Sequence, residues 1–140
     1  MPGPYVQAAT FCETVLVEKT DVVSVIRVVD RLMLSTSTLG APAELPEGNV
    51  IRATLFVSLK ADDAKGRHPI TVRAHQPSGI VKPDHTVDAT FEGDERGVIL
   101  ILTLGIEAIE GLHWFDILVN ETVLTRVPLR IIYQRTPALS

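Results

Sequence analysis

The stretch LHWFDILVNETVLTRVPLRIIY, residues 112–133, gives the clearest indication of the fold class of this chain. It contains two runs rich in apolar, β-branched and aromatic residues, separated only by Asn120 and Glu121. Asparagine readily adopts the left-handed backbone conformation that tight hairpin turns require. The stretch therefore predicts an antiparallel hairpin of residues 112–119 and 122–133. Because Pro128 cannot donate a ladder hydrogen bond, the second strand is expected to lie at an edge or to bulge there.

The same pattern continues towards the N-terminus, where apolar runs alternate with turn-forming residues. Residues 5–17 and 22–34 form a second predicted hairpin around a short charged turn at residues 18–21. The segment 35–49 contains two glycines and two prolines, which predicts a long surface connection. Further strands are expected at residues 50–59, 70–74, 86–91 and 97–104.

This pattern of about eight strands, with no sustained helical period, predicts an all-β fold. We expect an antiparallel two-sheet sandwich of the Greek-key, C2 or immunoglobulin-like kind. The length of 140 residues suits a single domain over residues 1–140, with an ordered core at about residues 5–133. The run VILIL, residues 98–102, is apolar on both faces. Such a strand is expected either at the centre of the domain or with its outer face against a partner.

Composition excludes several classes of protein. The chain is 46% hydrophobic and 21% charged, so it can offset the entropy of ordering and is expected to fold unaided. A formal net charge of -4 argues against a nucleic-acid binder, since such proteins need clustered cations. The N-terminus has no signal segment, and no apolar stretch is long enough to span a membrane. We therefore expect a cytoplasmic protein that does not associate with membranes.

Charged loops give the only candidate metal site. In a sandwich, alternate connections gather at one end, which would bring several acidic loops together. Calcium binds six to eight oxygen ligands, mostly carboxylates on loops. Asp62, Asp63, Asp94 and Glu95 are the predicted ligands of such a site, as in a calcium- or membrane-responsive C2-like domain. The alternative is that these carboxylates are ordinary solvated loop residues, paired with nearby lysines and arginines.

Other reactive residue types are interpreted as structural. Cys12 is the only cysteine, so no internal disulfide can form, and we interpret it as a small buried apolar residue. None of the four histidines has a metal-ligand spacing; they are His68, His75, His85 and His113. On a strand, His113 shares a face with Phe115, while Trp114 takes the other face. We expect Trp114 to be a core residue, because large aromatics contribute much of a sandwich interior.

No local signature of catalysis is present. The chain has no recognisable nucleophile motif and no glycine-rich phosphate loop. We therefore predict no catalytic residue, no cofactor, no small-molecule substrate and no enzymatic activity.

Four segments resemble an uncharacterised family of small bacterial proteins, known only as a domain of unknown function. They are FCET at 11–14, SVIRVVDRL at 24–32, DAKGRHPITVR at 63–73 and FEGDERGVIL at 91–100. The resemblance covers nearly the whole chain and implies a small bacterial β-sandwich protein. It implies no activity, ligand or site residue.

The class of function that remains is binding of another protein through the surface of the domain. The chain is more apolar than a minimal sandwich requires, and excess apolar strand faces often mark an interface. Edge strands offer a second route, since a peptide or another copy can add to an unpaired ladder. The alternative is that all the valines and isoleucines pack in one core. We expect a protein–protein interaction or assembly module with a protein partner or a homo-oligomer, and the calcium-responsive domain is the second hypothesis.

Overall fold

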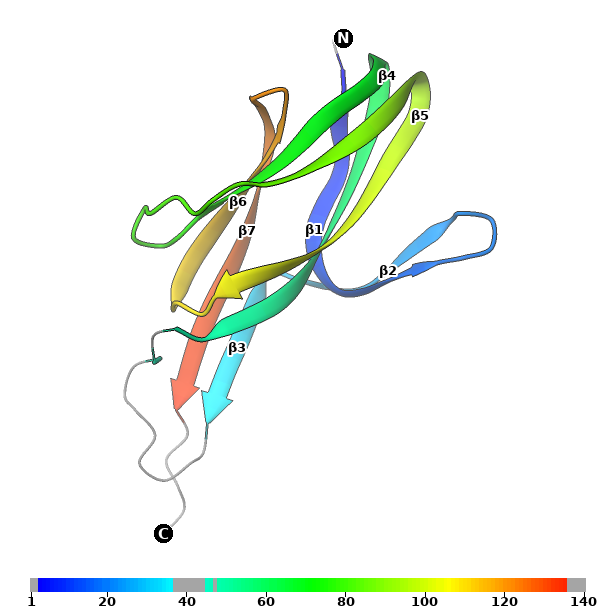
Figure 1. The fold of residues 1–140 in the computed structure, drawn as a ribbon. Helices are drawn as coiled ribbons and strands as arrows, with labels where there is room; N and C mark the ends of the chain where they lie inside the picture. Colours follow the sequence, from blue (N-terminus) through cyan, green and yellow to red (C-terminus); the bar gives the residue numbers. More distant parts are fainter. Residues whose placement is uncertain (1–2, 37–44, 47, 136–140) are drawn as a thin grey trace.

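The computed structural model describes residues 3–36, 45–46 and 48–135. The described residues contain no helix and form seven strands (Figure 1). The strands are β1 (Tyr5–Val17), β2 (Val23–Val29), β3 (Arg31–Thr36), β4 (Val50–His75), β5 (His85–Glu107), β6 (Gly111–Val119) and β7 (Thr122–Arg135). The all-β prediction is thus confirmed.

Hydrogen bonds join all seven strands in a single sheet. Its order is β2-β1-β4-β6-β7-β3, and β5 pairs with β4 outside this path. Every pairing is antiparallel except that of β3 with β7, which is parallel. The sequence predicted two separate antiparallel sheets, whereas the structure has one mixed sheet.

The cause of this difference is the length of β4 and β5. Each was predicted as two short strands, but their ladder runs from Val50↔Glu107 to Val72↔His85. The register shifts between Lys60 and Lys65, and positive φ angles occur at Asp62, Gly66, Gly93 and Asp94. Such bulges bend a ribbon without ending it. The charged segments near residues 62 and 94, expected to be loops, are therefore bent parts of the strands.

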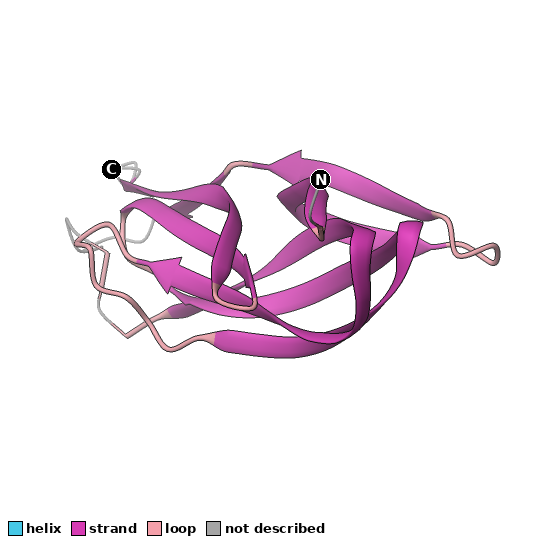
Figure 2. Ribbon diagram, turned by 90° about the horizontal axis from the view of Figure 1, so that it is seen from above, coloured by secondary structure: helices cyan, strands magenta, loops and turns pink. Residues whose placement is uncertain are grey.

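The bend folds the sheet back on itself, so that its two halves face each other (Figures 1 and 2). Phe11 of β1 meets Phe115 of β6 across this interior, with ring centroids 4.9 Å apart at 69°. Apolar residues from both halves surround the pair; Leu55, Ile70, Ile117 and Leu129 are all fully buried. One core therefore holds the two halves together.

The hairpin predicted at residues 112–133 is confirmed. β6 and β7 pair throughout, and Asn120 and Glu121 both have positive φ angles of 49° and 66°. Two residues of this conformation give a turn that matches the twist of the strands. β7 lies between β6 and β3, but its pairing with β3 begins at Arg130. Pro128 thus lies in a part of β7 with β6 as its only neighbour among the described strands.

The single strand predicted at residues 22–34 is wrong. The strand is interrupted at Asp30. Before it, β2 pairs with β1, and after it, β3 runs beside β7. The carbonyl of Asp30 accepts a hydrogen bond of 3.0 Å from the backbone N–H of Arg130, which places the start of β3 beside β7. Of the long connection predicted at 35–49, Ser35 and Thr36 belong to β3. Residues 37–44 and 47 lie outside the described residues.

Candidate interaction surfaces

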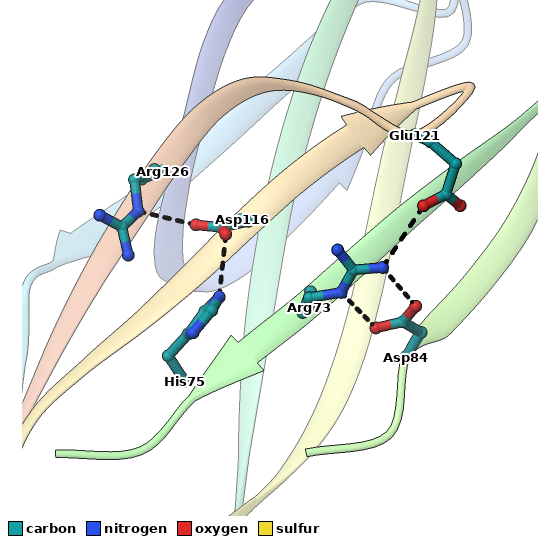
Figure 3. A network of polar contacts seen from close by, with 6 residues as sticks. All are labelled: Arg73, His75, Asp84, Asp116, Glu121 and Arg126. Atoms are coloured by element: carbon teal, nitrogen blue, oxygen red, sulfur yellow. Dashed lines mark hydrogen bonds and ion pairs between the residues drawn. The ribbon is translucent and has the colours of Figure 1, made fainter. Parts of the chain in front are cut away.

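The outer face of β6 and its neighbours is covered by polar side chains. Asp116 of β6 is 8% exposed and accepts two hydrogen bonds (Figure 3). Arg126 Nε donates to its Oδ1 at 2.8 Å, and His75 Nε2 donates to its Oδ2 at 2.9 Å. Because a carboxylate only accepts, His75 carries its hydrogen on Nε2 in this contact. The three side chains come from three adjacent strands and tie them together.

Trp114 belongs to this outer face. The guanidinium of Arg126 lies 5.2 Å from the centroid of its ring, a cation–π contact. The prediction of a core tryptophan is therefore wrong, since of these two neighbouring rings Phe115, not Trp114, lies in the core. The predicted alternation itself is confirmed, because His113 and Phe115 are both 2% exposed and share the inner face.

A second ion pair extends the polar face. Arg73 Nε and Nη2 each donate a 2.8 Å hydrogen bond to Asp84, one to each carboxylate oxygen, and Nη2 lies 3.6 Å from Glu121 Oε2 (Figure 3). A bidentate pair of this kind fixes the orientation of both groups. The hydrogen bonds from Arg73 lower the pKa of Asp84 below its ordinary value.

This ion pair predicts a small pH dependence of stability. A carboxylate whose pKa is lower in the folded state stabilises the fold above its unfolded pKa of about 3.9, and this contribution is lost as the pH falls through the folded value. Because the Asp84 side chain is 36% exposed, we expect less than about 1 kcal/mol. Urea unfolding at neutral pH and near pH 3 should show a smaller acid loss for Asp84→Asn than for the native chain. An identical loss in both proteins would contradict this.

An apolar surface lies on the other half of the folded sheet. Val98, Leu100 and Leu102 of β5 pack towards the core, while Ile99 and Ile101 point outwards and remain 41% and 43% exposed. Residues 97–106 contain no charged side chain. Of the two expectations for the run at 98–102, a central strand is wrong because β5 pairs with β4 alone among the described strands.

The hairpin of β1 and β2 continues this surface. It projects from the body of the molecule, and β2 pairs with β1 alone within the described part of the chain (Figure 1). Its large apolar side chains are 37–64% exposed; they are Leu16, Val17, Val22, Ile26 and Val28. A hollow of about 340 Å³, lined by Val23 of the hairpin and Ile99 of β5, connects the two regions. By strand alternation and register, Leu16, Ile26 and Val28 lie on the same side of the sheet as Ile99 and Ile101, and we call these five residues the apolar face.

A cavity of about 270 Å³ lies elsewhere, between residues 82–85 and the last part of β5. Its apolar lining includes Val72, Leu104, Ile106 and Phe115. Seven polar or charged residues also line it: Gln76, Lys82, Asp84, His85, Thr103, Glu107 and His113. Sequence reasoning missed this cavity, because its lining comes from segments that only the bend of β4 and β5 brings together.

The four predicted calcium ligands lie at or beside this bend. Asp62 and Asp94 are opposite each other in the β4–β5 ladder. Asp63 Oδ1 accepts a hydrogen bond from the backbone N–H of Gly3, and the carbonyl of Glu95 accepts one of 3.3 Å from Lys60 Nζ. In residues 3–36, 45–46 and 48–135, no three His, Cys, Asp or Glu side chains group so that they could hold a metal ion. The calcium site stays a prediction.

Two further residues, His68 and Cys12, have ordinary structural surroundings. His68 contacts Asn120 at 2.9 Å and the carbonyl of Lys65 at 2.9 Å. Cys12 is 4% exposed, and burial raises the pKa of its thiol. The interpretation of Cys12 as a small buried residue is confirmed.

Comparisons with known proteins add a distant structural similarity. No protein-family model matches the chain, and no curated protein does. The chain is similar to the crystal structure of an immunoglobulin-like protein from Pseudomonas aeruginosa, with 9% identity and a TM-score of 0.44 over 92% of this chain and 96% of that one. Membership of the bacterial family suggested by four segments stays a prediction. The described residues include no helix that could cross a membrane.

Proposed function

We propose that this protein is a non-enzymatic protein–protein interaction or assembly module, in which the folded sheet works as a two-layered sandwich and the apolar face binds a protein. The observation that carries this proposal is the exposure of Ile99 and Ile101 on a strand segment without any charge, beside a projecting hairpin with exposed apolar side chains.

The contrast between the two outer faces supports the proposal. One is covered by hydrogen-bonded arginine, histidine and aspartate side chains, as around Asp116. The other exposes the five side chains of the apolar face. Large contiguous apolar patches are rare on monomeric proteins and commonly mark binding sites. Covering them would gain roughly 25 cal/mol for each Å² of apolar surface removed from water.

The test compares two single substitutions of matched chemistry. Ile101→Asp places a charge on the apolar face, whereas Val123→Asp places one at a residue of similar exposure, 48%, on β7. Tagged native, Ile101→Asp and Val123→Asp proteins are used to capture partners from lysate of cells that naturally produce the protein, and their self-association is measured by sedimentation. We expect Ile101→Asp to weaken a stoichiometric complex or oligomer at least about tenfold, the effect of burying one unpaired charge, and Val123→Asp to leave it intact.

Two results would overturn the proposal. One is a native protein that remains monomeric and captures no stoichiometric partner. The other is a complex that Ile101→Asp and Val123→Asp weaken equally. Running the capture with calcium and again with a chelator tests the second hypothesis, because a calcium-responsive domain requires a complex that chelation removes and that depends on Asp62 and Asp94.

A further inference from the structure

One edge of the last part of β5 pairs with no described strand, and we call it the free edge. Among the described strands β5 pairs with β4 alone, and the ladder keeps one register from Gly97 to Glu107. In an antiparallel ladder, alternate residues direct their backbone groups to the neighbouring strand or away from it. The N–H of Ala108 donates to the carbonyl of Asn49 at 2.8 Å, which fixes this alternation. The backbone N–H and C=O groups of the odd-numbered residues therefore point away from β4. These residues are Ile99, Ile101, Thr103 and Gly105.

This edge lacks the features that usually keep strand edges from pairing. Proteins protect such edges with charges, prolines, bulges or very short strands. Elsewhere in the sheet, β3 has only six residues, the free part of β7 contains Pro128, and the first part of β5 contains Asp88. Arg27 of β2 has a φ of 57°. Residues 97–106 of β5 have no charge, no proline and no register shift.

The 270 Å³ cavity lies beside this edge, on the inner side of the sheet. Thr103, Leu104, Gly105 and Ile106 form one of its walls. Side chains of a strand alternate between faces, so a strand added here would direct every second side chain inwards, towards the cavity. An apolar cavity of about 150 Å³ is enough to hold benzene. This cavity therefore has room for one aromatic side chain.

Two buried side chains of the lining, Gln76 and His113, each have a hydrogen-bond acceptor that indicates which aromatic side chain fits. Gln76 is 8% exposed, and its Nε2 donates to Glu107 Oε2 at 2.9 Å, which leaves its Oε1 as an acceptor. His113 is 2% exposed, and its Nε2 donates to the carbonyl of Ile109 at 2.6 Å, which leaves Nδ1. No donor from the described residues bonds to either remaining atom. A ring that carries an O–H or N–H group, tyrosine or tryptophan, can supply one.

We propose that the free edge of β5 at residues 97–106 binds an extended peptide segment of a partner protein as an added strand, with a tyrosine or tryptophan of that segment in the cavity. This inference deepens the proposed function and rests on it. Strand addition draws affinity from backbone hydrogen bonds and specificity from pockets for alternate side chains. A second copy that pairs through its own β5 does not supply this aromatic side chain, because residues 97–106 contain no tyrosine or tryptophan.

The probe is a displayed library of random peptides of about ten residues, the upper end of ordinary strand lengths. Binders selected on the native protein are expected to share a tyrosine or tryptophan flanked by alternating apolar residues. Binding of a selected peptide is then measured by fluorescence anisotropy. Thr103→Pro removes a backbone N–H that points away from β4, whereas Thr103→Val keeps it. We expect about tenfold weaker binding to Thr103→Pro only, the effect of one or two lost hydrogen bonds.

A second variant tests the cavity and does not alter the edge. Ala74 is half-buried in the cavity lining, so Ala74→Leu fills part of the space. It is expected to weaken the selected peptide about tenfold, while an analogue with alanine in place of the aromatic residue binds native and variant proteins alike. Thermal unfolding of each variant shows whether it folds. If Thr103→Pro does not fold, the result for Ala74→Leu decides the outcome.

The two proposals can fail separately. A library that yields no binder, or binders indifferent to both Thr103→Pro and Ala74→Leu, overturns the strand-addition site. If capture of a natural partner is lost in Ile101→Asp but retained in both of these variants, the interaction module stands and the peptide site falls. If native protein shows neither capture nor self-association, the proposed function falls as well.

Discussion

Phe115→Ala is expected to lower the free energy of unfolding by about 3–5 kcal/mol, the usual cost of removing a buried phenylalanine side chain. Phe115 is 2% exposed and Phe11 is fully buried, so the substitution leaves a cavity that surrounding residues fill only in part. The edge-to-face contact of the two rings, worth about 0.5–1.5 kcal/mol beyond burial, is lost as well. Because the pair joins the two halves of the folded sheet, the loss affects the whole molecule.

Urea unfolding followed by the fluorescence of Trp114 measures this change. Tyr5→Ala is the matched control, because Tyr5 is also an aromatic residue of the sheet but is 51% exposed. Its replacement should change the stability by about 0.5 kcal/mol or less. A loss below about 1 kcal/mol for Phe115→Ala would mean that the two halves are not held by this packing.

Asp116→Ala should destabilise the protein by about 1.5–3 kcal/mol, the range for hydrogen bonds to a charged group. The carboxylate is 8% exposed, and its two oxygens accept from Arg126 and His75 at 2.8 and 2.9 Å. Removing it leaves two donors of the polar face without their acceptor. Part of the loss is recovered because Arg126, 53% exposed, can turn to water.

Asp30→Ala is the control for this substitution. Asp30 is an aspartate whose side chain is 78% exposed and lies 3.3 Å from Nε of its neighbour Arg31. An exposed pair of this kind contributes about 0–1 kcal/mol. Chemical unfolding of both variants at neutral pH gives the comparison, and equal losses would show that the Asp116 network contributes no more than an exposed ion pair.

Local pattern was sufficient to predict the β6–β7 hairpin. Asn120 and Glu121 supply the turn, and strict alternation places His113 and Phe115 on one face, as the structure has them. The apolar run at 98–102 correctly indicated a strand, with Ile99 and Ile101 left exposed on its outer side. These features depend only on residues close together in the chain.

Features that depend on register could not be predicted. The charged segments around Asp62 and Asp94 have the composition of loops. The β4–β5 ladder nevertheless continues on both sides of the bulge there. The size of Trp114 favours the core, but Arg126 covers its ring on the outer face. The β6–β7 register shifts between Ile117 and Leu118, which the two-residue turn alone does not reveal. The parallel pairing of β3 with β7 likewise depends on a long-range contact at Asp30.

The continuous path of β4 and β5 also determines how the molecule can come apart. In a protein made of two separately bonded layers, one layer can melt while the other persists. Here the same two strands supply hydrogen bonds to both halves, and their ladder shifts register at the bend, between residues 60 and 65. Opening either half therefore removes ladder partners from the other, which favours a single cooperative unfolding transition over stepwise loss. The bend of β4 and β5 that gives the sheet its folded shape is thus also the reason that we expect the protein to unfold as one unit.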